Sequence, residues 1–316
     1  STNISDHTEF PLKENKYGRV NNILKDIFFM KPNAPFIKKS GAKKDIKMFH
    51  NGFYRVGVKQ DSNSFLRCVD LLTSYILKQN FNLKSFIKKI IKDIKKLSVK
   101  DIFDIGGGSF IQYFRNDKIN DKKIYEKDCI NDSINNFKNY LESDEPKDHK
   151  LLIPVLMKCN PDLNILVLSE TYEKRGVEII NTKLEISEPL GGLIIHKDKP
   201  FLMIYQIEEY YESLMYYYNG EEYSIIDNIQ DKIKPIINDI IYISGETAEI
   251  IEINKEEFKI KYDNGVKSEI SIKDCIKYDR SIIYKILYNF ILDCKNKSVR
   301  NKKEIIQFED LDFIMN

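Results

Sequence analysis

The spacing of apolar residues changes along the chain, and this change constrains the fold more than any other feature of the sequence. Between residues 65 and 97 apolar side chains recur every three or four positions, as they do on one face of a helix. Beyond residue 160 they form short continuous or alternating runs, which are typical of strands. Helical and strand patterns in different parts of one chain predict an α+β protein.

The first third is expected to be mainly helical. Helices are predicted over residues 17–30, 65–79 and 83–97, whereas residues 53–60 have a short extended pattern. Pro32 ends the first helix, because proline lacks an amide donor and restricts the residue before it.

The middle of the chain is expected to be a mixed α/β domain with a β-hairpin. Residues 163–168 are apolar without interruption, which indicates a buried strand. Residues 193–196 and 201–205 are predicted as the two strands of the hairpin, joined by a turn that contains Pro200.

Near the C-terminus three strands are predicted over residues 249–253, 258–262 and 268–272. Asn264-Gly265 joins two of them, because this pair readily adopts positive φ in a tight turn. These strands predict a small β-barrel of the SH3 or Tudor type, closed by a helix over residues 280–294. The expected organisation is a flexible lead-in (1–16), a basic helical region (17–105), an α+β domain (106–242) and the small β-barrel with its C-terminal helix (243–316).

Charge is distributed unevenly along the chain. Residues 1–100 contain 21 Lys and Arg against 8 Asp and Glu, a net charge of +13, whereas the remainder carries −11. A segregated field of this kind attracts polyanions more strongly than the total of +2 implies. The alternative is that the basic region meets an acidic protein surface, which would make the chain a scaffold or virion interaction protein.

The candidates for DNA contact come from this basic region. Arg55 and Arg67 are candidates for base edges, because a guanidinium can bind guanine through two hydrogen bonds. Lysines of the helix over 83–97 would add long-range attraction, although the same pattern is typical of a solvated helix face. The candidate DNA-binding residues are Lys38, Lys39, Lys43, Lys44, Lys47, Arg55, Lys59, Arg67, Lys88 and Lys92.

The sequence contains no recognisable catalytic motif. Gly106-Gly107-Gly108 lacks the Gly-Lys-Ser/Thr ending of a P-loop and is interpreted as a structural turn. A metal-dependent nuclease remains an alternative because Asp162, Glu170 and Glu208-Glu209 are available, but the acidic-x-Lys element is missing from the predicted hairpin. We therefore expect a non-enzymatic protein.

No cofactor, metal or membrane segment is expected. The five cysteines are widely spaced without a CxxC pair, and the four histidines are scattered, so neither a disulfide framework nor a zinc site is predicted. No apolar run approaches the 18 uncharged residues of a membrane span.

Several short segments occur in an order that is informative. They are Lys16-Tyr17-Gly18-Arg19, residues 53–58, 63–66, 105–110, 134–141, 149–156, 163–170 and 193–205, and Tyr210-Tyr211-Glu212-Ser213-Leu214. In this order they resemble the large subunit of the poxvirus early transcription factor and its homologues in other nucleocytoplasmic large DNA viruses. The resemblance covers roughly residues 16–220. Ser213-Leu214 departs from it, since many relatives have Pro-Ile there, and the family's cysteine-containing segment is not in this chain, which is then expected to be a fragment.

The resemblance implies a function. It implies binding to early promoter duplex DNA, recruitment of the viral RNA polymerase, and pairing with a small subunit that hydrolyses ATP. It also implies a location in the virion and in the viral factory of the host cytoplasm.

Overall fold

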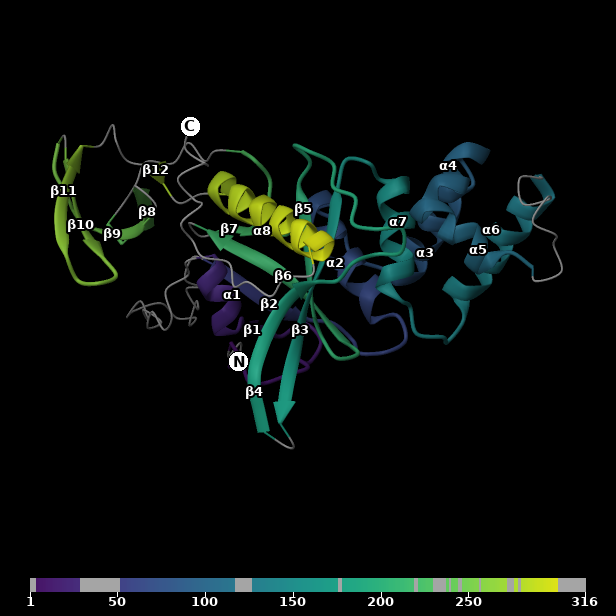
Figure 1. Ribbon diagram of the computed structural model, residues 1–316, viewed down its shortest axis with the longest axis horizontal. Coiled ribbons are helices and arrows are strands. Elements are labelled where there is room, and N and C mark those ends of the chain that lie inside the picture. Colours follow the sequence, from purple (N-terminus) through teal and green to yellow (C-terminus); the bar gives the residue numbers. More distant parts are fainter. Residues whose placement is uncertain are drawn as a thin grey trace. The chain divides into compact units, whose positions relative to one another are not determined.

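The computed structural model divides by its contacts into two compact units, Ser1–Asp26 with Met30–Ile225, and Ile27–Phe29 with Ile226–Asn316. Figure 1 shows their helices and strands. The structure describes residues 4–28, 52–116, 127–175, 178–218, 221–229, 237–238, 240–243, 246–255, 257–271, 276–277 and 280–300.

A mixed sheet runs through the first unit. Its strands are β1 (Tyr17–Arg19), β2 (Gly52–Gly57), β3 (Asn164–Arg175), β4 (Glu178–Ile186), β5 (Phe201–Ile207), β6 (Tyr210–Tyr218) and β7 (Glu221–Tyr223). They lie in the order β1–β2–β6–β5–β3–β4, and β7 pairs with β6. β3 and β5 are parallel, and the other neighbours are antiparallel.

Helices pack against this sheet and against one another. They are α1 (Asn22–Ile27), α2 (Ser64–Leu77), α3 (Leu83–Ile94), α4 (Val99–Asp104), α5 (Ser109–Phe114), α6 (Lys127–Glu142) and α7 (His149–Cys159). Figure 1 shows α3 to α7 grouped together beside the sheet. α2 and α3 confirm the helices predicted from apolar spacing. The side chain of Asn82 caps α3 by accepting a hydrogen bond from the Ser85 amide at 3.1 Å.

The sheet is buried on both faces, which explains the unbroken apolar run at the start of β3. Ile165 and Val167 belong to the main core, together with residues of α2 and α7. Leu166 and Leu168 alternate with them, point to the opposite face and are also buried. A strand covered on both faces needs apolar residues at every position.

The prediction of a helical first third is wrong. Among the described residues, Tyr17–Arg19 and Gly52–Gly57 are strands of the central sheet, and the helix predicted from residue 17 begins only at Asn22. Strands therefore occur together with helices from the start of the first unit, and the class is mixed α/β. The predicted helix ended near residue 30, beyond the last described residue of this segment, 28.

The hairpin predicted over residues 193–205 is also wrong. β5 forms as expected, but residues 193–200 are not a strand. The side chain of Asn164 accounts for this, since it donates to the carbonyl oxygens of His196 and Lys199 and accepts from the His196 amide at 2.7 Å. The observed hairpin is the antiparallel pair of β5 and β6.

The second unit contains an open antiparallel sheet. Its elements are β8 (Ile240–Ile243), β9 (Glu246–Ile253), β10 (Glu257–Tyr262), β11 (Lys267–Ser271), β12 (Ile276–Lys277) and α8 (Arg280–Arg300). The tight turn at Asn264-Gly265 is confirmed, with Gly265 at φ 86° between β10 and β11. The predicted barrel is wrong, because β11 and β12 lie at opposite ends of the order β11–β10–β9–β8–β12 and do not pair within the described residues.

Candidate nucleic-acid interface

The ten candidate residues do not form one surface. Five of them lie outside the described residues, namely Lys38, Lys39, Lys43, Lys44 and Lys47. The other five fall into three different environments, which are described in turn.

Arg55 lies inside the protein, on the sheet face opposite α2. Only 1% of it is exposed, and each hydrogen-bonding edge of its guanidinium is occupied. Its Nη1 donates to Glu212 Oε2 at 2.8 Å. Its other nitrogens donate to backbone carbonyl oxygens, those of Arg19 at 2.7 Å and of Asp6 and Glu9 at 3.1 Å.

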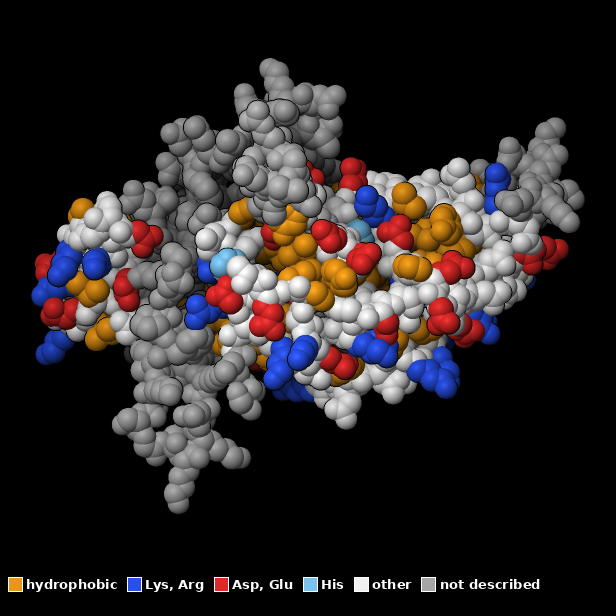
Figure 2. Space-filling model, turned by 90° about the horizontal axis from the view of Figure 1, so that it is seen from below, with side chains coloured by type: hydrophobic (Ala, Val, Ile, Leu, Met, Phe, Trp, Pro, Cys, Tyr) orange, Lys and Arg blue, Asp and Glu red, His pale blue; other side chains and the backbone are white. Residues whose placement is uncertain are grey.

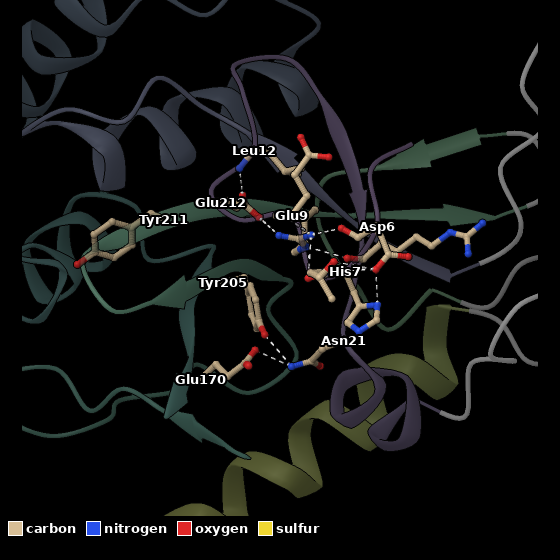
Figure 3. Close-up of polar contacts among 12 residues, drawn as sticks. Asp6, His7, Glu9, Leu12, Asn21, Glu170, Tyr205, Tyr211 and Glu212 are labelled. Atoms are coloured by element: carbon tan, nitrogen blue, oxygen red, sulfur yellow. Dashed lines mark hydrogen bonds and ion pairs between the residues drawn. The ribbon is translucent and has the colours of Figure 1, made fainter. Parts of the chain in front are cut away.

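Glu212, on the neighbouring strand β6, is the acidic partner. Its second carboxylate oxygen accepts the Leu12 amide at 2.6 Å, as Figure 3 shows. Burial raises the pKa of the Glu212 carboxyl, and the charge of Arg55 opposes that rise. The pair thus joins the chain before β1 to the middle of the sheet.

Asn21 adds a second attachment on the same face. Its amide nitrogen donates to Glu170 Oε2 at 2.6 Å and to the Tyr205 hydroxyl at 2.8 Å (Figure 3). Residues 5–21 therefore cover this side of the sheet. The assignment of Arg55 to a base edge is corrected accordingly, because its guanidinium is enclosed and already bound.

Arg67 and Lys59 share a partially exposed carboxylate. Arg67, on α2, donates through Nε and Nη2 to Asp61, with Nη2 at 2.8 Å from Oδ2. Partial burial acts to raise the pKa of Asp61, but hydrogen bonds from Arg67 and the Asn63 amide outweigh it, so the pKa is lowered. Lys59 lies 3.7 Å from the same carboxylate and is 61% exposed. Arg67 is thus committed to Asp61, whereas Lys59 remains accessible.

Lys88 and Lys92 lie on an exposed surface, formed by α3 and the turn after it, that we call the lysine face. It consists of Lys84, Lys88, Lys89, Lys92, Lys95 and Lys96, all exposed. The opposite side of the helix buries Ile90, Ile91 and Ile94. Within the described part of the chain only one residue of the lysine face, Lys96, has an acidic partner, Asp93 at 2.8 Å.

The lysine face has the dimensions of a backbone contact. Lys84 and Lys95 are eleven residues apart, which corresponds to about 16 Å along a helix. Duplex DNA carries one negative charge per roughly 1.7 Å of its axis. Several phosphates therefore lie within the length of this helix.

The acidic residues considered for a nuclease do not gather. Glu170 accepts from Asn21, and Asp162 binds Lys199 at 2.6 Å. In the described ranges there is no group of three or more His, Cys, Asp or Glu residues that could hold a metal ion. Nor is any described helix long and apolar enough to cross a membrane.

His149 was given no role by sequence reasoning, and it occupies a polar cluster behind α2. It is 3% exposed. Its Nδ1 lies 2.7 Å from the Tyr211 hydroxyl and its Nε2 lies 2.6 Å from Ser187 Oγ. Burial lowers the pKa of His149 to about 4, so the ring is neutral at pH 7.

The burial of Arg55 had one visible signal in the sequence. Arg55 interrupts an otherwise apolar strand, and Glu212 likewise lies within a run of aromatic and apolar residues. Opposite charges that each break an apolar strand indicate a buried pair, because a single buried charge is costly.

Comparison of the chain with protein-family models, with curated proteins and with solved structures finds no match.

Proposed function

We propose that this chain is a DNA-binding module of a viral early transcription initiation factor, and that the lysine face of α3 contacts the DNA backbone. The observation that carries the proposal is a row of exposed lysines on α3 and the turn after it, of which only Lys96 has an acidic partner among the described residues. Phosphate contacts of this type provide affinity without reading sequence.

The arrangement of these lysines costs stability. Lys84, Lys88 and Lys92 follow one another at intervals of four on α3, so neighbouring charges face each other along the helix. Like charges at this spacing destabilise a helix by about 0.2–0.5 kcal/mol per pair. A bound polyanion would remove that repulsion, and this favours a binding role over a merely solvated face.

The resemblance supplies the rest of the proposal. Promoter duplex DNA is the proposed ligand, and the viral RNA polymerase and an ATPase small subunit are the proposed partners. The virion and the viral factory are the proposed locations. Arg55 is enclosed and Arg67 is bound to Asp61, so neither arginine is available to contact a base edge. The lysine face therefore accounts only for affinity to the DNA backbone.

The test is a binding titration by fluorescence anisotropy. A labelled AT-rich duplex and a scrambled duplex are titrated at several salt concentrations between 50 and 200 mM with the protein and with the variant K84Q/K88Q/K92Q. Each phosphate contact contributes about −0.9 to the slope of log K against log salt, so the variant should lose about 2.7 from the magnitude of that slope.

A matched variant controls for net charge. K255Q/K261Q/K267Q removes three exposed lysines of the second unit and should leave the slope unchanged. Equal slopes for the α3 variant and the unaltered protein would overturn the proposal. Equal affinity for the duplex and for polyglutamate of the same length would also overturn it, and would instead indicate an acidic protein partner.

A further inference from the structure

A cavity of about 470 Å³ opens to the surface of the first unit. It lies among the end of α3, α4, α7 and the segment 189–196. Its lining is mostly apolar and includes Leu97, Ile105, Ile153, Met157 and Leu190. The volume is within the range of about 300–1,000 Å³ that is usual for ligand pockets.

Gly106 and Gly192 line this cavity, and glycines next to them adopt backbone conformations that other residues rarely take. Gly106, Gly107 and Gly108 have φ of 56°, 62° and 94°, which L side chains rarely adopt. A Cβ on Gly191 would lie 2.2 Å from the backbone of Gly106. The backbone at Gly106 and the backbone at Gly191 are therefore in direct contact at the cavity. The glycine triplet allows this close packing.

The rim combines apolar and acidic side chains. Leu190 and Ile194 are 38% and 54% exposed although both are large and apolar. Asp101 is bound to Lys158 at 2.8 Å and to Ser98 Oγ at 2.6 Å. Asp104 is exposed, and the described residues offer it no cationic partner.

We infer that this cavity binds a partner protein that inserts an apolar side chain with a basic residue next to it. The apolar lining receives the inserted side chain, and Asp104 at the rim receives the basic one. The proposal goes beyond DNA binding and does not depend on it.

Two features favour a protein over other occupants. Leu190 and Ile194 line the cavity and are also exposed at its mouth, and a small molecule held inside the cavity would leave that apolar surface uncovered. The carboxylate of Asp104 repels phosphate, which disfavours nucleic acid, whereas that of Asp101 is bound to Lys158. Figure 2 shows one face of the molecule, on which hydrophobic side chains gather in patches with charged ones around them.

Methionine methyl groups provide a local readout. The protein is labelled with ¹³C-methyl methionine, and the Met157 signal is identified by its loss in Met157→Leu. Met157 lines the cavity, whereas Met203 and Met215 are buried elsewhere and serve as internal references. The probe is the acetylated peptide Ser-Arg-Leu-Phe-Arg-Ser, compared with versions in which Glu replaces Arg or Ser replaces Leu and Phe.

The expected result is a saturable shift of the Met157 signal with the basic apolar peptide only. Asp104→Lys should weaken binding about fivefold, because it turns one exposed attraction into repulsion. Ile194→Asp should weaken it about tenfold by loss of apolar contact. Asp128→Lys makes the same charge change at an exposed position of α6 and should have no effect.

Three outcomes would overturn the inference. The first is no Met157 shift at millimolar peptide, and the second is an equal shift with the acidic peptide. The third is a shift caused by a small apolar compound such as indole when no peptide gives one, which would identify a small-molecule site instead.

Discussion

Arg55 and the lysine face of α3 contribute to the same basic excess in the sequence, but the structure gives them opposite environments. Arg55 is 1% exposed and has four close acceptors. The lysines are exposed, and only Lys96 has an acidic partner within the described ranges. The comparison teaches that a charge count measures how many basic groups a region has, while burial decides how many can meet a ligand.

The largest expected effect is that of Arg55→Ala. It leaves Glu212 buried without its charged partner and removes the donors to three backbone carbonyls. Breaking a buried pair in this way costs about 3–5 kcal/mol in free energy of unfolding. Urea denaturation measures it. Arg55→Lys should recover little, because one ammonium cannot span these acceptors, and a loss below about 1 kcal/mol would show that the buried pair is not structural.

His149 sharpens the comparison, because it is a basic group that is buried without charge. Its folded pKa of about 4 is below the usual 6.5, so the unfolded state binds the proton more readily. Stability from this group is complete above pH 6.5 and falls by about 3 kcal/mol as the pH drops from 6.5 to 4. Thermal or urea unfolding across this range measures the loss. His149→Gln should flatten that part of the profile, and an unchanged profile would contradict the assignment.

Arg67 is intermediate in exposure between Arg55 and the lysine face. Its pair with Asp61 is 20–25% exposed, so Arg67→Ala should cost at most about 1 kcal/mol at pH 7. The pKa of Asp61 is lowered in the folded protein, so this stabilisation is present above its usual value of 3.8 and is lost as the pH falls through the folded value. In urea titrations the difference between the two proteins should shrink as the pH is lowered from 7 to below 3.8. A difference that does not change with pH would indicate a packing role for the arginine.

The smallest expected effect on stability is that of Lys88→Ala. It removes like-charge contacts to Lys84 and Lys92, so the free energy of unfolding should change by less than about 0.5 kcal/mol, and upward. The same substitution should reduce the salt dependence of DNA binding by about 0.9 in slope. Stability and binding are measured on one preparation. A clear loss of stability would show that Lys88 has a structural role, as Arg55 does, and is not simply an accessible charge.

Local signals in the sequence predicted local structure well. α2 and α3 follow from apolar spacing, and the turn between β10 and β11 follows from Asn264-Gly265. The exposure of the lysine face also follows, because a helix that buries Ile90, Ile91 and Ile94 must turn its other side to solvent.

Pairing between distant strands was not predictable in the same way. β1 has three residues, and its partner β2 begins more than thirty positions later, so no window of sequence contains the pair. The loss of the expected hairpin likewise depends on Asn164, which lies outside the hairpin itself. The partner of Arg55 is 157 positions away, and only the apolar surroundings of each residue hint at the contact.

Three of the short sequence segments noted above form neighbouring strands in the structure. Lys16-Tyr17-Gly18-Arg19 supplies β1, residues 53–58 supply β2, and Tyr210–Leu214 begins β6. β1 pairs with β2 and β2 pairs with β6. These segments form the frame that encloses Arg55, and the lysine face lies outside them.

The hydrogen bonds of Glu212 to the Leu12 amide and to Arg55 have a consequence for the synthesis of the protein. Until residue 212 leaves the ribosome, Arg55 lacks its counterion and the Leu12 amide lacks its acceptor. At translation rates of about 5–20 residues per second, the 157 residues between the two partners take roughly 8–30 s to make. During that interval the front of the nascent chain is unprotected, and it is the part on which a chaperone would act.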